Sequence, residues 1–275
     1  MRFPKYPLAL AFSVLATPAF AQDVKDPPPP ITVSGSVGIV SDYRFRGVSQ
    51  SDKEVALQGG ITVAHESGFY VGTWGSNLAG WGTFGGANLE LDLIAGYKMP
   101  LANGTLDVGA TWYMYPGGAD KTDFIEPYAK LSGTAGPATL TASVFYAPKQ
   151  EALGLFVRSA TPFVAGPGTS EDNLYLAGDA AVALPTTPVT LKAHIGYSDG
   201  NPGLGPNGTS VAPTGKYWDW SLGADMTWKN LTFNVSWVDT DISASKAAYL
   251  QPNLSKTTGG SIVGSTVVVG LTAAF

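Results

Sequence analysis

Apolar and polar residues alternate one by one along many short stretches of this chain, and a period of two residues is typical of β-strands. The stretch 217–228 is the clearest case. One face carries Trp218, Trp220, Leu222, Ala224, Met226 and Trp228, and the other carries Tyr217, Asp219, Ser221, Gly223, Asp225 and Thr227. The final stretch, 265–275, places Val267, Val269, Leu271, Ala273 and Phe275 on one face. The pattern predicts an all-β protein whose last strand lies within a sheet.

The expected strands are joined by connections that are alternately short and long. The short ones carry turn-forming residues or two polar residues: Glu66–Gly68, Leu101–Gly104, Ala135–Pro137, Pro185–Pro188 and Lys229–Asn230. The long ones cover 44–54, 79–87, 116–122, 148–172, 199–216 and 242–261. This alternation predicts a transmembrane up-and-down antiparallel β-barrel with periplasmic turns and extracellular loops. We count about twelve strands, with ten or fourteen also compatible, and we expect both termini on the periplasmic side.

Alternation alone does not say which face points inward, because a soluble lipocalin-like barrel or sandwich would bury the apolar set. Trp218 and Trp228 lie at opposite ends of one apolar face. With a rise of about 3.3 Å per residue and a tilt of about 40°, they are roughly 25 Å apart along the membrane normal, the height of a lipid-facing band. The polar faces are rich in Gly, Ser and Thr and carry few Lys and Glu residues. We therefore expect the apolar face to contact lipid.

Composition agrees with a barrel in a membrane. The chain has 275 residues, of which only 13% are charged, with 34 Gly and no Cys. Residues 1–21 have the basic start, the apolar stretch and the Ala19–Ala21 cleavage motif of a signal peptide. Residues 22–30 form a proline-rich periplasmic spacer, so 31–275 are expected to be a single outer-membrane barrel domain. The net charge of −5 argues against nucleic acid as a partner.

Closure of the barrel requires the last strand to pair with the first, which we place at 32–42. A terminal Phe275 after a signal peptide is typical of the strand that the outer-membrane assembly machinery recognises. The expected partners are therefore this machinery, the lipid bilayer and small solutes, while the oligomeric state stays open. With two His and no Cys, neither a cofactor nor a metal site is expected.

Three blocks in the first third of the chain resemble the TorF family of proteobacterial porin-like proteins: Ser41–Ser51, Gly68–Ser76 and Leu89–Tyr97. The resemblance implies an outer-membrane barrel with a transport role and no catalytic residues. The first block contains the motif residues Asp42, Tyr43, Arg44, Arg46 and Gly47. If the strand continues through it, Arg44 and Arg46 share a face and form a charged patch with Asp42 at the extracellular mouth. The alternative is an ion-pair cluster that fixes the exit from strand to loop.

The polar faces predict the lining of a pore. We expect these residues to point inward: Glu90, Asp92, Lys98, Asp107, Tyr113, Glu126, Lys130, Asp179, Lys192, His194, Tyr217, Asp219 and Asp225. Because carboxylates are in excess, a pore lined this way would favour cations modestly. The alternative is that acids and bases pair across the lumen and leave it neutral or plugged. We expect the long 148–172 connection to form the constriction or a lid.

Two other classes of function remain open. An outer-membrane hydrolase would need a nucleophile, and Gly196–Gly200 matches G-x-S-x-G, with His194 nearby. No helix is expected after that stretch, so we interpret the match as chance. The G-x-G-x-x-G match at Gly203–Gly208 lacks a helix start for the same reason. A structural or adhesion barrel would act through its loops, where aromatic residues such as Trp74 and Trp81 could take part.

Overall fold

The computed structural model describes residues 29–83, 86–118, 121–154, 157–160, 163–165, 168–200, 215–243 and 260–275. The expected signal peptide, most of the proline-rich spacer and the Gly203–Gly208 motif lie outside the described residues. Within the described part of the chain, no helix is long and apolar enough to cross a membrane.

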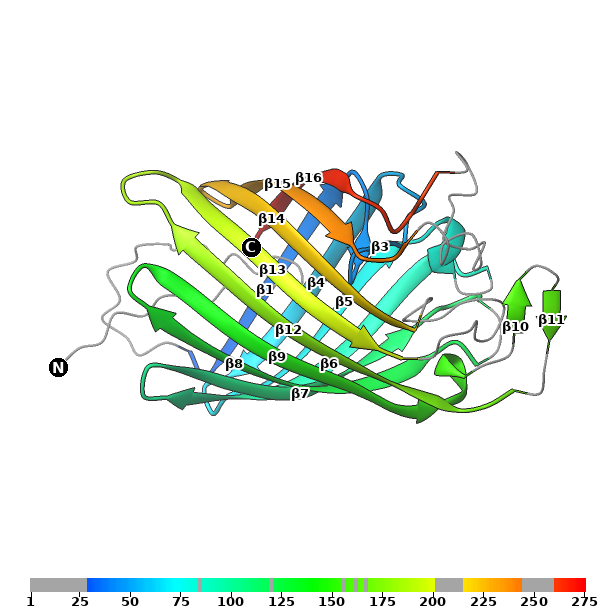
Figure 1. Ribbon diagram of the computed structural model, residues 1–275. Helices are drawn as coiled ribbons and strands as arrows, with labels where there is room; N and C mark the ends of the chain where they lie inside the picture. Colours follow the sequence, from blue (N-terminus) through cyan, green and yellow to red (C-terminus); the bar gives the residue numbers. More distant parts are fainter. Residues whose placement is uncertain are drawn as a thin grey trace.

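Twelve strands form one closed barrel in which neighbouring strands are antiparallel (Figure 1). They are β1 (Ile31–Val40), β4 (Ala56–His65), β5 (Phe69–Asn77), β6 (Leu89–Leu101), β7 (Gly104–Met114), β8 (Phe124–Ala135), β9 (Ala138–Gln150), β12 (Glu171–Ala183), β13 (Val189–Asp199), β14 (Lys216–Trp228), β15 (Leu231–Thr240) and β16 (Thr266–Ala274). The predicted fold class and the count of twelve strands are confirmed.

The barrel closes between its first and last strands. Ser36 lies opposite Ala274, and Val40 lies opposite Gly270. Phe275 continues the pairing, since its N–H and C=O both hydrogen-bond to the backbone of Gly35 at 2.9 Å. The prediction that the terminal strand pairs with the first one is therefore confirmed, and closure leaves neither strand with an unpaired edge.

The five predicted tight turns each connect two neighbouring strands of the wall. The start of β1 and the end of β16 both lie at the end of the barrel that carries these tight turns. Ile31 pairs with His65, which directly precedes the turn between β4 and β5. At the other end of the chain, the N–H of Ala274 donates to the C=O of Asn230 in the turn between β14 and β15. The even number of strands and the position of both chain ends at the same end of the barrel are those of an up-and-down barrel.

The apolar face points outward. Trp218 and Trp228 of β14 are 45% and 65% exposed, whereas Tyr217 on the opposite face of the same strand is 1% exposed. Leu, Ile and Val side chains of the other wall strands are similarly exposed on the outside. A soluble protein would hide such a surface, so the outer face is one that lipid covers.

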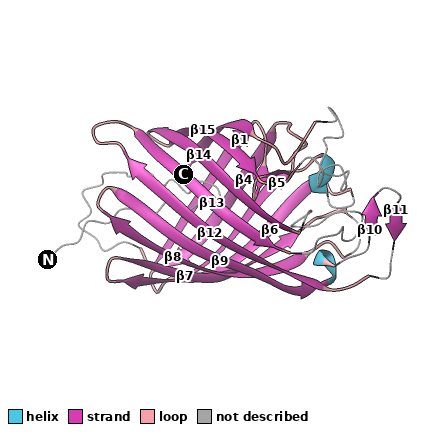
Figure 2. Ribbon diagram, in the orientation of Figure 1, coloured by secondary structure: helices cyan, strands magenta, loops and turns pink. Residues whose placement is uncertain are grey.

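Short elements lie at the long-loop end, as Figure 2 shows. Two 3₁₀ turns, η1 (Gly80–Thr83) and η2 (Glu151–Leu153), follow β5 and β9. One small hairpin, β10 (Val157–Ala160) and β11 (Phe163–Ala165), projects beyond the end of the wall (Figure 1). Another, β2 (Arg44–Phe45) and β3 (Val48–Ser49), belongs to the connection between β1 and β4.

Candidate functional site

The connection between β1 and β4 turns into the barrel instead of continuing the wall. Residues Asp42–Asp52, here called the inner segment, are almost all buried. The hairpin of β2 and β3 turns at Arg46 and Gly47, whose φ angles are +49° and +78°. Gly47 is required at this tip because an added Cβ would lie 2.4 Å from Thr240 Cγ2 and in a backbone region that L side chains rarely adopt.

A buried ion pair attaches the tip of the inner segment to the opposite wall. Arg46 Nη2 donates to both carboxylate oxygens of Glu126 on β8 at 2.7 Å, and both side chains are inaccessible to solvent. The guanidinium lies over the Tyr175 ring at 4.1 Å, and the Tyr217 hydroxyl donates to the Arg46 carbonyl. Burial opposes the charge of Arg46, but the nearby Glu126 carboxylate more than offsets it and raises the pKa of the guanidinium. The tip therefore carries a permanent positive charge.

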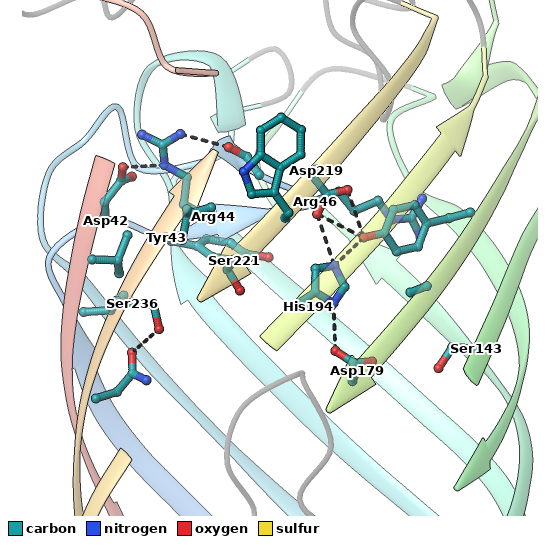
Figure 3. A pocket seen from close by; sticks show the side chains of 18 of the residues that line it. Asp42, Tyr43, Arg44, Arg46, Ser143, Asp179, His194, Asp219, Ser221 and Ser236 are labelled. Carbon is teal, nitrogen blue, oxygen red and sulfur yellow. Dashed lines mark hydrogen bonds and ion pairs between the residues drawn. The ribbon is translucent and has the colours of Figure 1, made fainter. Parts of the chain in front are cut away.

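Arg44 has a different role. Its Nε donates to Asp42 Oδ2 at 2.6 Å, and its Nη1 donates to the carbonyl oxygens of Gly47 and Ile262 at 2.8 Å (Figure 3). Ser49 Oγ donates to the other oxygen of Asp42 at 2.5 Å. Arg44 and Arg46 thus point to separate partners, and the prediction that they share a face of one strand is wrong. The strand ends at Val40, and the ion-pair alternative describes Asp42 and Arg44.

Tyr43 connects the inner segment to β5 and β6. Its hydroxyl donates to Glu90 at 3.1 Å, and its ring packs edge-on against Trp74 with a centroid distance of 5.4 Å. Burial raises the pKa of the Tyr43 phenol, and the negative charges of Glu90 and Asp92 raise it further. Tyr43 therefore remains a neutral hydrogen-bond donor.

Apolar side chains fill the long-loop end on both sides of the inner segment. One cluster contains Tyr43, Phe45, Ala56, Leu78, Ala87, Tyr113, Tyr115, Phe124, Ala147, Ala152 and Leu153. The other contains Val48, Trp81, Tyr217, Ile242, Ile262 and Val263. Ala152 and Leu153 belong to the 148–172 connection, so this connection packs onto the inner segment from outside. The inner segment crosses the lumen at this end, and the expectation that 148–172 forms the constriction or a lid stays a prediction, because part of that connection lies outside the described residues.

Trp74 and Trp81 are enclosed in this packing. Trp74 lies against Tyr43, and Trp81 is 4% exposed in the second cluster. The hypothesis that these two aromatic residues serve adhesion from the loops is therefore wrong, because neither ring is presented to the outside.

The charged residues expected to face inward do lie on the inner face. Glu90, Asp92, Asp107, Tyr113, Glu126, Tyr217, Asp219 and Asp225 are buried there. Lys192 pairs with Asp225 at 3.0 Å, and His194 contacts Asp179 at 2.7 Å and Asp219 at 3.2 Å. The ammonium groups of Lys98 and Lys130 lie over the rings of Tyr70 and Tyr128. Asp107 accepts a hydrogen bond from Tyr70, whose hydroxyl also contacts that of Tyr128.

Two neighbouring cavities occupy the lumen between the inner segment and the tight-turn end. The first, of about 290 Å³, is lined by Asp42 and Arg44 on one side and by Arg46, Asp219, His194 and Asp179 on the other (Figure 3). The second, of about 260 Å³, shares Asp179 and His194 with the first and extends toward the tight-turn end. The site is therefore a polar lumen covered at one end by the inner segment.

Sequence reasoning missed Tyr175, which is 3% exposed and donates to both carboxylate oxygens of Asp219. The period of two residues on β12 contains the signal, because Tyr175 and the predicted inward residue Asp179 lie on the same face. The contact between Tyr175 and Arg46 could not be predicted, because the two residues are far apart in the sequence.

The hydrolase motif has no matching geometry. Ser198 is fully buried on β13, and its hydroxyl donates to Asn173. The His194 ring bonds to Asp179, Asp219 and Tyr175, and so it is oriented toward the lumen acids. Within the described residues, no group of three or more His, Asp and Glu side chains is placed to hold a metal ion.

A closed antiparallel barrel with an apolar outside and a polar inside defines an outer-membrane β-barrel, and the protein resides in the bacterial outer membrane. The chain belongs to the family described as "Bacterial protein of unknown function (Gcw_chp)", whose model matches residues 24–275. No curated protein matches the chain.

Solved structures share the fold. One membrane protein, from work on in-meso crystallization of membrane proteins, aligns with a TM-score of 0.52 and 8% identity over 88% of this chain and 83% of that chain. An outer membrane channel from Pseudomonas putida F1 aligns with a TM-score of 0.43 and 10% identity over 90% and 98%. An anion-selective porin from Comamonas acidovorans aligns with a TM-score of 0.38 and 13% identity over 89% and 99%. At these identities the similarity concerns the fold alone.

Proposed function

We propose that the protein is an outer-membrane channel through which small hydrophilic solutes diffuse passively, with a modest preference for cations. The observation that carries this proposal is the polar cavity of about 290 Å³ between the inner segment and the barrel wall. A second cavity of about 260 Å³ with shared lining residues extends it along the lumen. Twelve strands leave a lumen narrower than that of a sixteen-stranded porin, which suits small solutes.

The inner segment forms the gate of the proposed channel. It crosses the lumen at the long-loop end and is attached to the far wall through Arg46 and Glu126. A hydrogen bond from Tyr43 to Glu90 attaches it to β6, two strands away from β8. Permeation requires this segment to shift or to leave a narrow path beside it, so conductance depends on these contacts. The tight-turn end would face the periplasm, as short turns do in barrels of this type.

Charge on the inner face supports the cation preference. Carboxylates outnumber cationic side chains among the inner-face residues, and Arg46, Lys192 and His194 pair with only some of them. Fixed negative charge inside a narrow pore lowers the barrier for cations. The resemblance of the inner segment to the TorF family supports a transport role as well.

Planar-bilayer recording of the purified, folded protein tests this proposal. We expect small conductance steps and, under a potassium chloride gradient, a reversal potential on the cation-selective side. A liposome-swelling panel with neutral, cationic and anionic solutes provides the second readout. A folded protein without any channel events contradicts the channel, whereas faster permeation of anions contradicts only the charge preference.

A further inference from the structure

A third cavity, of about 100 Å³, lies beside the inner-segment end of the lumen. It is lined by Asp92 of β6, Thr111 and Tyr113 of β7, Trp74 of β5, and Tyr128, Lys130 and Phe145 of β8 and β9. One carboxylate, one ammonium group, several hydroxyls and several aromatic rings thus converge on a single small space. The named residues come from five wall strands that follow one another in the sheet, β5 to β9.

Asp92 is the unusual member of this lining. It is 5% exposed, and its Oδ1 is buried without a hydrogen-bond partner in the described residues. The described ion pairs do not include Asp92 or its neighbour Glu90. Glu90 at least accepts the Tyr43 hydroxyl, Arg46 is engaged by Glu126, and Lys130, which also lines the cavity, forms none of the described ion pairs. A buried carboxylate is costly unless a donor or a positive charge compensates it.

The aromatic lining already holds one ammonium group. Lys130 Nζ lies 4.3 Å from the Tyr128 ring centroid and 5.2 Å from that of Phe145. This contact shows that rings in this cavity accommodate a positive charge. Lys130 contacts Tyr128 and Phe145, whereas no described cation–π contact involves the other aromatic rings of the lining, Trp74 and Tyr113.

We propose that this cavity is a binding subsite for the primary ammonium group of a small solute. Its N–H groups would donate to Asp92 and to the Thr111 hydroxyl, and its charge would face the indole of Trp74, the aromatic ring that attracts cations most strongly. A primary ammonium fits better than a quaternary one, because the unpartnered carboxylate requires a hydrogen-bond donor. This inference rests on the proposed channel, because it names the class of solute that would bind in the lumen.

Saturation-transfer NMR with methylammonium chloride tests the subsite on the full, folded protein in detergent micelles. We expect saturable binding to the unaltered protein and at least about tenfold weaker binding to Asp92→Asn, since a charge-assisted hydrogen bond is lost. Tetramethylammonium, which has no N–H group, should bind more weakly than methylammonium. Thr111→Val, which has nearly the same shape as the native residue, provides a second variant if Asp92→Asn does not fold.

Asp172→Asn is the matched control, because it removes the same charge from a residue that hydrogen-bonds to the exposed Tyr146 outside the lumen. It should leave methylammonium binding unchanged. The proposal is overturned if the unaltered protein shows no saturable binding, or if Asp92→Asn and Thr111→Val bind as it does. Binding without conductance would retain the subsite and reject the channel, and conductance without binding would do the reverse.

Discussion

Arg46 is the residue on which the closed lumen most depends. Its guanidinium is buried at the tip of a hairpin, bonded to Glu126 and stacked on Tyr175, while its own carbonyl accepts the Tyr217 hydroxyl. Isolated charges are seldom buried, because removal from water costs several kcal/mol that only a partner can offset. One ion pair therefore decides whether the tip stays inside the barrel.

Removal of either member of this pair should release the inner segment. Arg46→Ala leaves Glu126 buried and unpaired, a change that typically costs about 3–5 kcal/mol. We expect higher and noisier single-channel conductance with unchanged strand content by circular dichroism. Lys121→Ala, which removes an exposed ion pair with Glu151, should change stability by less than about 1 kcal/mol and leave conductance unaltered. Equal conductance in the two variants would contradict the role of Arg46.

Two glycines with nearly equal backbone angles give a second test at this scale. Gly47 and Gly117 have φ angles of +78° and +77°, but an added Cβ would collide with Thr240 at Gly47 and meet nothing within 4 Å at Gly117. Gly47→Ala should therefore disturb the hairpin tip and raise conductance. Gly117→Ala should lower the free energy of unfolding by only about 1 kcal/mol, from the positive φ angle, and leave conductance unchanged. Bilayer recordings of both variants decide the matter, and an equal response would assign the effect to backbone strain alone.

At the scale of elements, the wall and the inner segment are separable. Val40 is paired with Ala56, so β1 and β4 form a hairpin from which the residues between them are inserted inward. The β10–β11 hairpin lies outside the end of the wall (Figure 1). The insertion covers the lumen, while the wall strands hydrogen-bond to one another without it.

Replacement of 42–54 by a two-residue Asn-Gly turn should thus preserve the barrel and enlarge the pore. We expect a several-fold higher conductance and faster swelling of liposomes with larger neutral solutes. Deletion of 157–165 serves as the comparison and should leave conductance close to that of the unaltered protein. If this deletion opens the channel and the first replacement does not, the constriction lies in 148–172 after all.

At the scale of the whole molecule, closure depends on the chain end. Phe275 pairs with the Gly35 backbone, and its ring lies over Gly35, where a Cβ would come within 2.6 Å of Cζ. The same residue is 61% exposed on the outer face. It thus pairs with the first strand through its backbone while its side chain stays accessible from outside.

Deletion of Phe275 should lower the amount of folded protein in the outer membrane far more than it changes conduction by the molecules that do assemble. The measurement is heat-modifiable migration in membrane fractions, combined with bilayer recording. Phe69→Ala is the control, because Phe69 is a similarly exposed aromatic residue of the outer face, 64% exposed, away from the chain end. Normal membrane levels after deletion of Phe275 would refute the assembly signal.

The sequence alone determined the wall of this protein. A period of two residues identifies a strand and its faces locally, and tight turns such as Lys229–Asn230 mark where each strand ends, so twelve strands and their outward sides could be predicted. Only the tertiary structure decided what fills the lumen. Arg46 and Glu126, or Arg46 and Tyr175, meet across the closed barrel, and no local pattern encodes such contacts between distant strands. The sequence identifies 44–54 only as a long connection. Its position inside the barrel depends on the fit of Gly47 against Thr240 and on the pairing of a buried charge, which are properties of the closed barrel and not of the segment.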